Sequence, residues 1–185
     1  MEPVLTPYRF TIDQYQRMGE TGILHEDDPV ELIDGVIVQM CPIGLKHIAS
    51  VDRCTRQFTQ RIGDRAIVRV QSPFRLLPRS EPEPDILILR DRPDFYAGVA
   101  AGPEDILLVV EVADSSLDYD RRVKLPRYAA GGIPEAWIVN LVDDCVEVER
   151  NPSQGQYREH LLLRRGELLR PQALPDVVIP VEALL

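Results

Sequence analysis

The stretch Leu107–Lys124, LLVVEVADSSLDYDRRVK, decides how the chain folds. It begins as a run of leucine and valine, which is typical of a central strand covered on both faces. Glu111 falls inside this run, and a helical pattern that carries Lys124 follows it. An ionised carboxylate loses its hydration inside a sheet, so Glu111 must pair with a base, reach solvent or bind a cation.

The remaining segments alternate between strand and helix patterns. Apolar residues spaced by three and four mark helices, and alternating or continuous apolar runs mark strands. The predicted helices cover 11–18, 45–63 and 116–132, and Pro126 ends or kinks the last one unless it sits in the first turn of a second piece. The predicted strands cover 30–40 as a hairpin turning at 34–35, then 66–71, 74–78, 85–89, 105–112, 135–140, 144–150 and 155–170 as a hairpin turning at 165–166. This order predicts one α/β domain over residues 1–185, with a mixed central β-sheet flanked by helices.

The composition is that of a globular chain with an acidic balance. The net charge of −9 argues against a nucleic-acid binder, although acidic residues also gather where a metal ion is held. No apolar run is long enough to cross a membrane, and the first residues do not follow a signal-peptide pattern. The three cysteines are widely spaced, which favours neither a disulfide framework nor a zinc site. We therefore expect a cytoplasmic protein without a membrane partner.

A second acid lies in an unusual place. Asp85 follows the prolines of EPEP and opens the strand ILIL. If this strand neighbours the one that carries Glu111, the two carboxylates could share one ion, and hard cations such as Mg²⁺ prefer oxygen ligands and keep several waters. Glu31 opens the first hairpin, and Lys124 could approach from the following helix to orient a nucleophile or stabilise charge on a phosphate.

Three segments together resemble one known family. They are ELIDGVIV at 31–38, PEPDILIL at 82–89 and VVEVADSSLDYDRRVKLPRYAAGGIPEAWIVN at 109–140. This ordered set resembles the Uma-two family of restriction endonucleases, which belongs to the PD-(D/E)xK nuclease superfamily, and the resemblance extends from about residue 10 to about residue 163. It implies a restriction-endonuclease-like core and metal-dependent hydrolysis of phosphodiester bonds.

The resemblance assigns roles position by position. Asp85 matches the acid of the PD element, and Glu111 matches the acid of the (D/E)xK element. The lysine of that element is replaced by Ala113, which departs from the superfamily pattern. In the resembled family the lysine is displaced onto the next helix, where Lys124 matches it. Glu31 matches the acid of the ELIDG element, as an auxiliary ligand or a residue that shapes the site.

The resemblance also implies a mechanism. Asp85 and Glu111, with the carbonyl of Val112, would hold Mg²⁺ or Mn²⁺, and Lys124 would position the attacking water or the phosphate. The implied substrate is DNA, of unknown target sequence. His47 falls in a segment where the resembled family often carries a histidine.

Each candidate also has an explanation that requires no metal. Asp85 could be an exposed acid at the start of a strand, and Lys124 a solvated helix residue. Glu111 could form a salt bridge with Lys124 or Arg121, and Glu31 could pair with an arginine near the hairpin.

Four further residues have ordinary structural explanations. His47 could be a residue of the helix surface. Asp118 and Asp120 suit a helix cap and first turn, where acids are stabilised by the helix dipole. Tyr128 is predicted to lie in the core.

Two classes of function remain open at this point. The first is a metal-dependent endonuclease that cuts DNA. The second is a catalytically inactive module of the nuclease fold that binds nucleic acid or protein, which the acidic balance and Ala113 favour. A third possibility is a purely structural homodimer paired through exposed strands near the C-terminus, and a dimer would also suit the cutting of both DNA strands.

Overall fold

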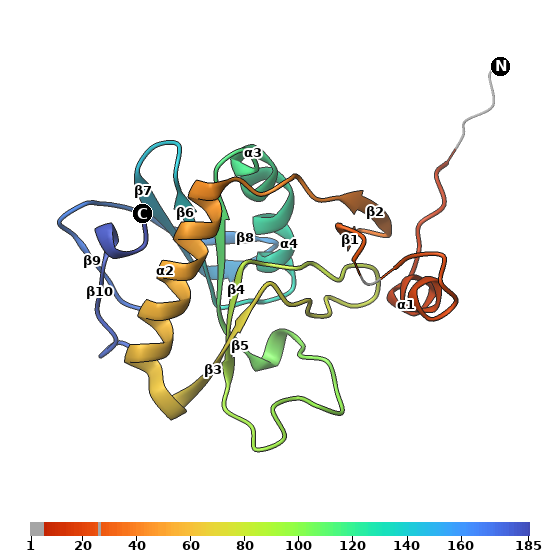
Figure 1. Ribbon diagram of the computed structural model, residues 1–185, viewed down its shortest axis with the longest axis horizontal. Helices are drawn as coiled ribbons and strands as arrows, with labels where there is room; N and C mark the ends of the chain where they lie inside the picture. The colour runs from red at the N-terminus through yellow and green to blue at the C-terminus, as the bar shows by residue number, and fades with distance from the viewer. Residues whose placement is uncertain (1–5, 26) are drawn as a thin grey trace.

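A mixed six-stranded sheet forms the centre of the molecule, as the sequence predicts (Figure 1). The computed structural model describes residues 6–25 and 27–185. The strands of this sheet lie in the order β3 (Ala66–Val70), β4 (Ile86–Arg90), β5 (Ile106–Ala113), β6 (Glu135–Asn140), β7 (Cys145–Ser153) and β8 (Gln156–Arg164). Two small sheets accompany it, formed by β1 (Val30–Ile33) with β2 (Val36–Gln39) and by β9 (Leu168–Leu169) with β10 (Ile179–Pro180).

The helical segments connect and cover these strands. The α-helices are α1 (Ile12–Glu20), α2 (Leu45–Ile62), α3 (Leu117–Tyr119) and α4 (Leu125–Ala130), and η3 (Asp120–Lys124) is a π-helical turn between the last two. Short 3₁₀ turns are η1 (Gly63–Arg65), η2 (Pro103–Asp105) and η4 (Val181–Ala183). The predicted long helix is therefore one run with a change of winding at η3, and Pro126 lies in the first turn of α4, where proline is tolerated.

The strand pairing explains why the third helical run exists. β5 and β6 are parallel, whereas every other pair of neighbours in the central sheet is antiparallel. Parallel strands that follow each other in the chain need a crossover connection, commonly a helix. The run α3–η3–α4 provides that crossover, and it begins directly after the strand that carries Glu111.

Two apolar cores lie on the two faces of the sheet. One contains Phe58 of α2 and Trp137 of β6, whose ring centroids lie 5.8 Å apart, together with residues of β9, β10 and η4. The other contains Tyr128 of α4 and Phe74. Figure 1 shows α2, β9 and β10 on one side of the sheet, and α4 and the β1–β2 hairpin on the other.

One predicted strand and one predicted strand pairing are wrong. Residues 74–78 form only an isolated bridge between Leu76 and Ser80, because Phe74 and Leu76 turn into the second core instead of joining the sheet. The strands predicted over 155–170 and the turn at Arg165 and Gly166 are present, but these strands do not pair with each other, because β8 pairs with β7 and β9 pairs with β10. A separate two-residue turn at Gln154 and Gly155 connects β7 to β8. Their φ angles of 53° and 74° suit the hairpin turns that match strand twist.

Within residues 6–25 and 27–185, no helix is both long enough and apolar enough to cross a membrane.

The packing between α2 and the sheet gives the first prediction. Phe58 is fully buried, so Phe58→Ala should lower the free energy of unfolding by about 3–5 kcal/mol through lost burial and a cavity. Leu45 lies on the same helix with 86% of its surface exposed, and Leu45→Ala should change it by less than about 0.5 kcal/mol. Urea denaturation measures both, and equal losses would contradict the assigned core.

Candidate functional site

Neighbouring strands place Asp85 and Glu111 at the same end of the sheet. In the antiparallel pairing of β4 with β5, Ile86 lies opposite Val110. One step further along this register brings Asp85 opposite Glu111, and residues directly opposite in an antiparallel pair share a face. Both side chains are buried.

Asp85 is held by backbone and by a histidine. Its Oδ2 accepts a hydrogen bond of 2.8 Å from the Val112 N–H and lies 3.1 Å from Nε2 of His47. The hydrogen bond to Asp85 raises the pKa of His47, although burial opposes this. The other ring nitrogen of His47, Nδ1, is buried without a hydrogen-bond partner among the described residues. Asp85 is therefore not an exposed strand-start acid, and His47 belongs to the site.

Glu111 lies beneath the helical crossover. The Tyr128 hydroxyl donates a 2.5 Å hydrogen bond to Glu111 Oε1, and Nζ of Lys124 lies 3.3 Å from the same oxygen. Burial raises the pKa of Glu111 well above its ordinary value, although the charge of Lys124 opposes this. Lys124 is therefore the positive charge that favours the ionised form of Glu111 against the cost of its burial.

Lys124 is shared between two carboxylates. Its side chain is buried, and Nζ lies 3.4 Å from Glu31 Oε2 as well as close to Glu111. Glu31 also accepts hydrogen bonds from the Tyr119 hydroxyl and from the Glu83 N–H, so protein donors contact both of its oxygens. Burial opposes the charge of Lys124, but Glu111 and Glu31 more than offset it and hold the pKa of Lys124 above its ordinary value. Glu31 thus pairs with a lysine and not with an arginine.

These residues surround one cavity of about 600 Å³. Six carboxyl side chains line it, against one lysine and one histidine: Glu31, Glu83, Asp85, Glu111, Asp114 and Asp120, with Lys124 and His47. Desolvation raises the pKa of Asp120 to about 6 and also raises the pKa of Glu83. The cavity therefore carries an excess of acidic groups that a bound cation would relieve.

The donor atoms suit a hard divalent cation. One oxygen of each strand acid is used by the protein, whereas Asp85 Oδ1 and Glu111 Oε2 accept no hydrogen bond from the described residues. Nowhere in the described part of the chain do three or more His, Cys, Asp or Glu side chains form a complete ligand set. Two carboxylate oxygens with water in the remaining positions is a common way to bind Mg²⁺.

Comparison with known proteins places the chain in a family. A family model described as "Uma2: Putative restriction endonuclease" matches residues 12–182. The chain belongs to this family. A protein of Anabaena variabilis, whose crystal structure is titled a "putative nuclease belonging to DUF820", matches with a TM-score of 0.72 and 16% identity, over 95% of this chain and 97% of that one. No curated protein matches the chain. The resemblance and the restriction-endonuclease-like fold are thus confirmed.

This member of the Uma2 family brings its lysine from the helix. Ala113 lies two residues beyond Glu111 on β5, so both side chains leave the sheet on one face. Ala113 is fully buried there in the core beneath α4. Lys124 of η3 lies over the same face of the sheet, and its Nζ is 3.3 Å from Glu111 Oε1. The amine is therefore present beside the acid even though the strand itself carries alanine.

Two residues of this Uma2 site were assigned to other roles from the sequence. Tyr128 is in the core as predicted, yet its hydroxyl also contacts Glu111. Asp120 was expected to serve as a first-turn acid, but its side chain is buried in the cavity and accepts a hydrogen bond from Ser116. The signal was the spacing of Asp120, Lys124 and Tyr128, which are four residues apart and so share a helix face.

The buried Asp120 gives a prediction on pH. Its pKa is about 6 in the folded chain against an ordinary 3.8, so its ionisation destabilises the folded state as pH rises from about 4 to about 6. Asp120→Asn cannot ionise. In the presence of a chelator the variant should be more stable than the parent at pH 7 by up to about 3 kcal/mol, and the difference should vanish near pH 4.

Chemical denaturation across this pH range measures the effect. The matched control is Asp118→Asn, because Asp118 is an exposed acid on the same helical run. A stability difference for Asp120→Asn that is absent, or that does not vary with pH, would contradict the assigned burial of its charge.

Proposed function

We propose that this protein is a divalent-metal-dependent endonuclease that hydrolyses phosphodiester bonds in DNA. The observation that carries the proposal is the buried Lys124 amine, which lies beside Glu111 in the cavity that Asp85 also lines. Membership of a family described as restriction endonucleases supports the reaction class.

Asp85, Glu111 and the carbonyl of Val112 would hold Mg²⁺ or Mn²⁺. The N–H and C=O of one residue in an extended strand point to the same edge. The Val112 N–H donates to Asp85, which directly precedes β4, so the Val112 carbonyl also points from β5 toward the side of β4. A divalent cation bound there lowers the pKa of a bound water and neutralises charge on the scissile phosphate.

Lys124 acts through its charge. Glu111 and Glu31 hold the pKa of Lys124 above its ordinary value, which favours the charged ammonium beside them. It can donate hydrogen bonds to a phosphate oxygen or orient the attacking water, and it stabilises negative charge that develops in the transition state. Glu31 holds the amine in place and leaves it shared with Glu111. Glu31 is therefore a positioning residue in this proposal and not a metal ligand.

Edge strand β8 supports a homodimer of this single domain. It lies at the end of the central sheet and exposes Leu161 and Leu162. An unpaired edge with apolar side chains favours pairing with a second copy. Two sites related by a two-fold axis would suit cleavage of both strands of a duplex.

The second candidate function is a nuclease-fold module that binds without cutting. Ala113 at the usual lysine position and the net charge of −9 favour it. It differs from the first candidate in needing no ion between Asp85 and Glu111.

Plasmid cleavage distinguishes the two candidates. Purified protein with Mg²⁺ or Mn²⁺ should nick supercoiled DNA, and Asp85→Ala, Glu111→Ala and Lys124→Ala should each lower the rate by about 10²-fold or more. The control is Lys46→Ala, because Lys46 is the only other lysine of the chain and is exposed on α2. It should cut as the parent does.

The same variants test ion binding. Mn²⁺ should raise the melting temperature of the parent and of Lys46→Ala, because a ligand that binds only the folded state stabilises it, but not that of Asp85→Ala. Equal cleavage by all the variants would identify a contaminant and refute the site. Absence of both cleavage and Mn²⁺ binding by the parent would favour the binding module.

A further inference from the structure

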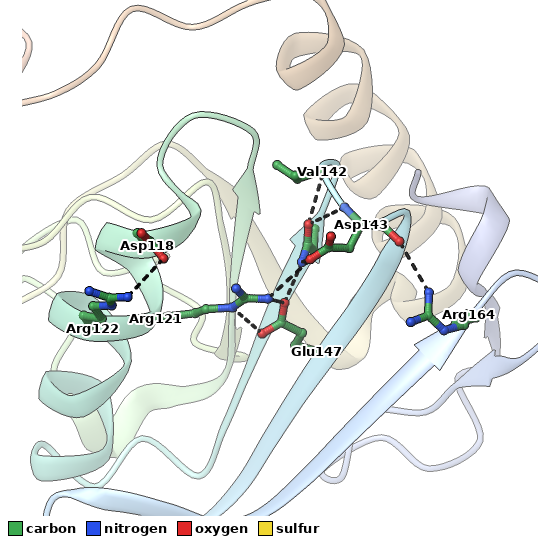
Figure 2. Close-up of polar contacts among 8 residues, drawn as sticks. Asp118, Arg121, Arg122, Val142, Asp143, Glu147 and Arg164 are labelled. Carbon is green, nitrogen blue, oxygen red and sulfur yellow. Dashed lines mark hydrogen bonds and ion pairs between the residues drawn. The ribbon is translucent and has the colours of Figure 1, made fainter.

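The π-helical turn η3 sends its side chains in two directions. Asp120 and Lys124 are buried and line the cavity. Arg121 does not line the cavity and instead reaches β7, as Figure 2 shows. Its Nε and Nη2 donate to the two carboxylate oxygens of Glu147 at 2.9 Å and 2.6 Å. This is a two-point contact between the helical crossover and the sheet, with fixed geometry.

Glu147 is itself held firmly. The amide of Asn140, which is fully buried at the end of β6, donates to Glu147 Oε1 at 2.8 Å and to Asp143 Oδ2 at 2.9 Å. The side-chain oxygen Oδ1 of Asn140 accepts hydrogen bonds from the N–H groups of Val142 and Asp143 and so closes the turn between β6 and β7. Arg121 therefore binds an acceptor that is itself hydrogen-bonded to the end of β6 (Figure 2).

The π-helical turn η3 needs a directional contact to keep its side chains in a fixed position relative to the sheet. In η3 the Leu125 N–H donates to the Asp120 carbonyl, a five-residue closure that is rare in helices and is frequent at functional sites. The apolar side chains beneath the helix set its distance from the sheet. Apolar packing is non-directional, so it does not by itself set the rotation of the helix about its axis. Lys124 must meet Glu111 and Glu31 at once, so a small rotation of the turn would break these contacts.

A second ion pair on the same helical run provides a contrast. Arg122 and Asp118 lie 3.8 Å apart, and 78% of each side chain is exposed. Exposed pairs of this kind contribute little to stability. Figure 2 shows Arg122 beside its own helix, whereas Arg121 crosses to the sheet.

We propose that Arg121 and Glu147 are positioning residues that fix the register of η3 and thereby place the Lys124 amine beside Glu111. The effect on catalysis rests on the proposed nuclease function, whereas the effect on the position of Lys124 does not. Neither residue lines the cavity. Both act through Lys124.

The lysine content of the chain allows a direct test. Lys46 and Lys124 are its only lysines, so protein labelled with ¹³C at lysine Cε gives two side-chain NMR signals. Arg121→Ala should shift or broaden the Lys124 signal and leave the exposed Lys46 signal in place. Arg122→Ala should leave both signals unchanged. Glu147→Gln, which keeps an oxygen for Asn140 but removes the charge, should move the Lys124 signal by a smaller amount.

Plasmid cleavage gives the second readout. Arg121→Ala should lower kcat by about 10-fold to 10²-fold with little change in KM, because a misplaced group costs turnover and not binding. Arg121→Lys keeps the positive charge but loses the two-point contact of the guanidinium with Glu147. Its kcat should lie between those of the parent and Arg121→Ala.

The outcomes separate this inference from the nuclease assignment. An unmoved Lys124 signal in Arg121→Ala, or one that moves as far in Arg122→Ala, overturns the positioning role even if the parent cuts DNA. A selective shift supports it even if the parent cuts nothing. Circular dichroism and the Lys46 signal report folding, and if Arg121→Ala does not fold, the shift in Glu147→Gln decides.

Discussion

The ammonium group of Lys124 between Glu31 and Glu111 is the interaction on which the site depends. Lys124 is only 6% exposed, and a buried charge is tolerated only beside opposite charges; each carboxylate needs the amine for the same reason. Glu31 comes from the β1–β2 hairpin, Glu111 from the central strand β5, and Lys124 from the crossover that follows β5. The electrostatic requirement thus brings three separate segments of the chain together at the site.

The sequence predicts the parts of this arrangement that depend on local pattern. The apolar run of β5 and the strand after Asp85 are evident from composition, and an acid at the end of each must be compensated. The hairpin turn at Asp34 and Gly35 follows an equally local rule. The spacing on α2 predicts a buried stripe of Ile48, Val51, Cys54 and Phe58, and all but Ile48, which is 39% exposed, are buried.

Contacts between distant segments were not predictable in this way. Whether Phe74 joins a strand or fills the core depends on the space beneath α4. The role of Tyr128 depends on the rotation of the crossover, which a π-helical turn sets and no propensity predicts. Sequence reasoning found the acids and the lysine but not the hydrogen bonds that fix them, because those bonds depend on tertiary geometry.

Anomalous diffraction from crystals soaked in Mn²⁺ tests the central claim most directly, because it locates an ion without reference to activity. The account predicts one peak bonded to Asp85 Oδ1 and Glu111 Oε2, with the Lys124 amine still between Glu111 and Glu31. No peak at this position in crystals of the parent, or a peak that displaces the amine from both carboxylates, would contradict it.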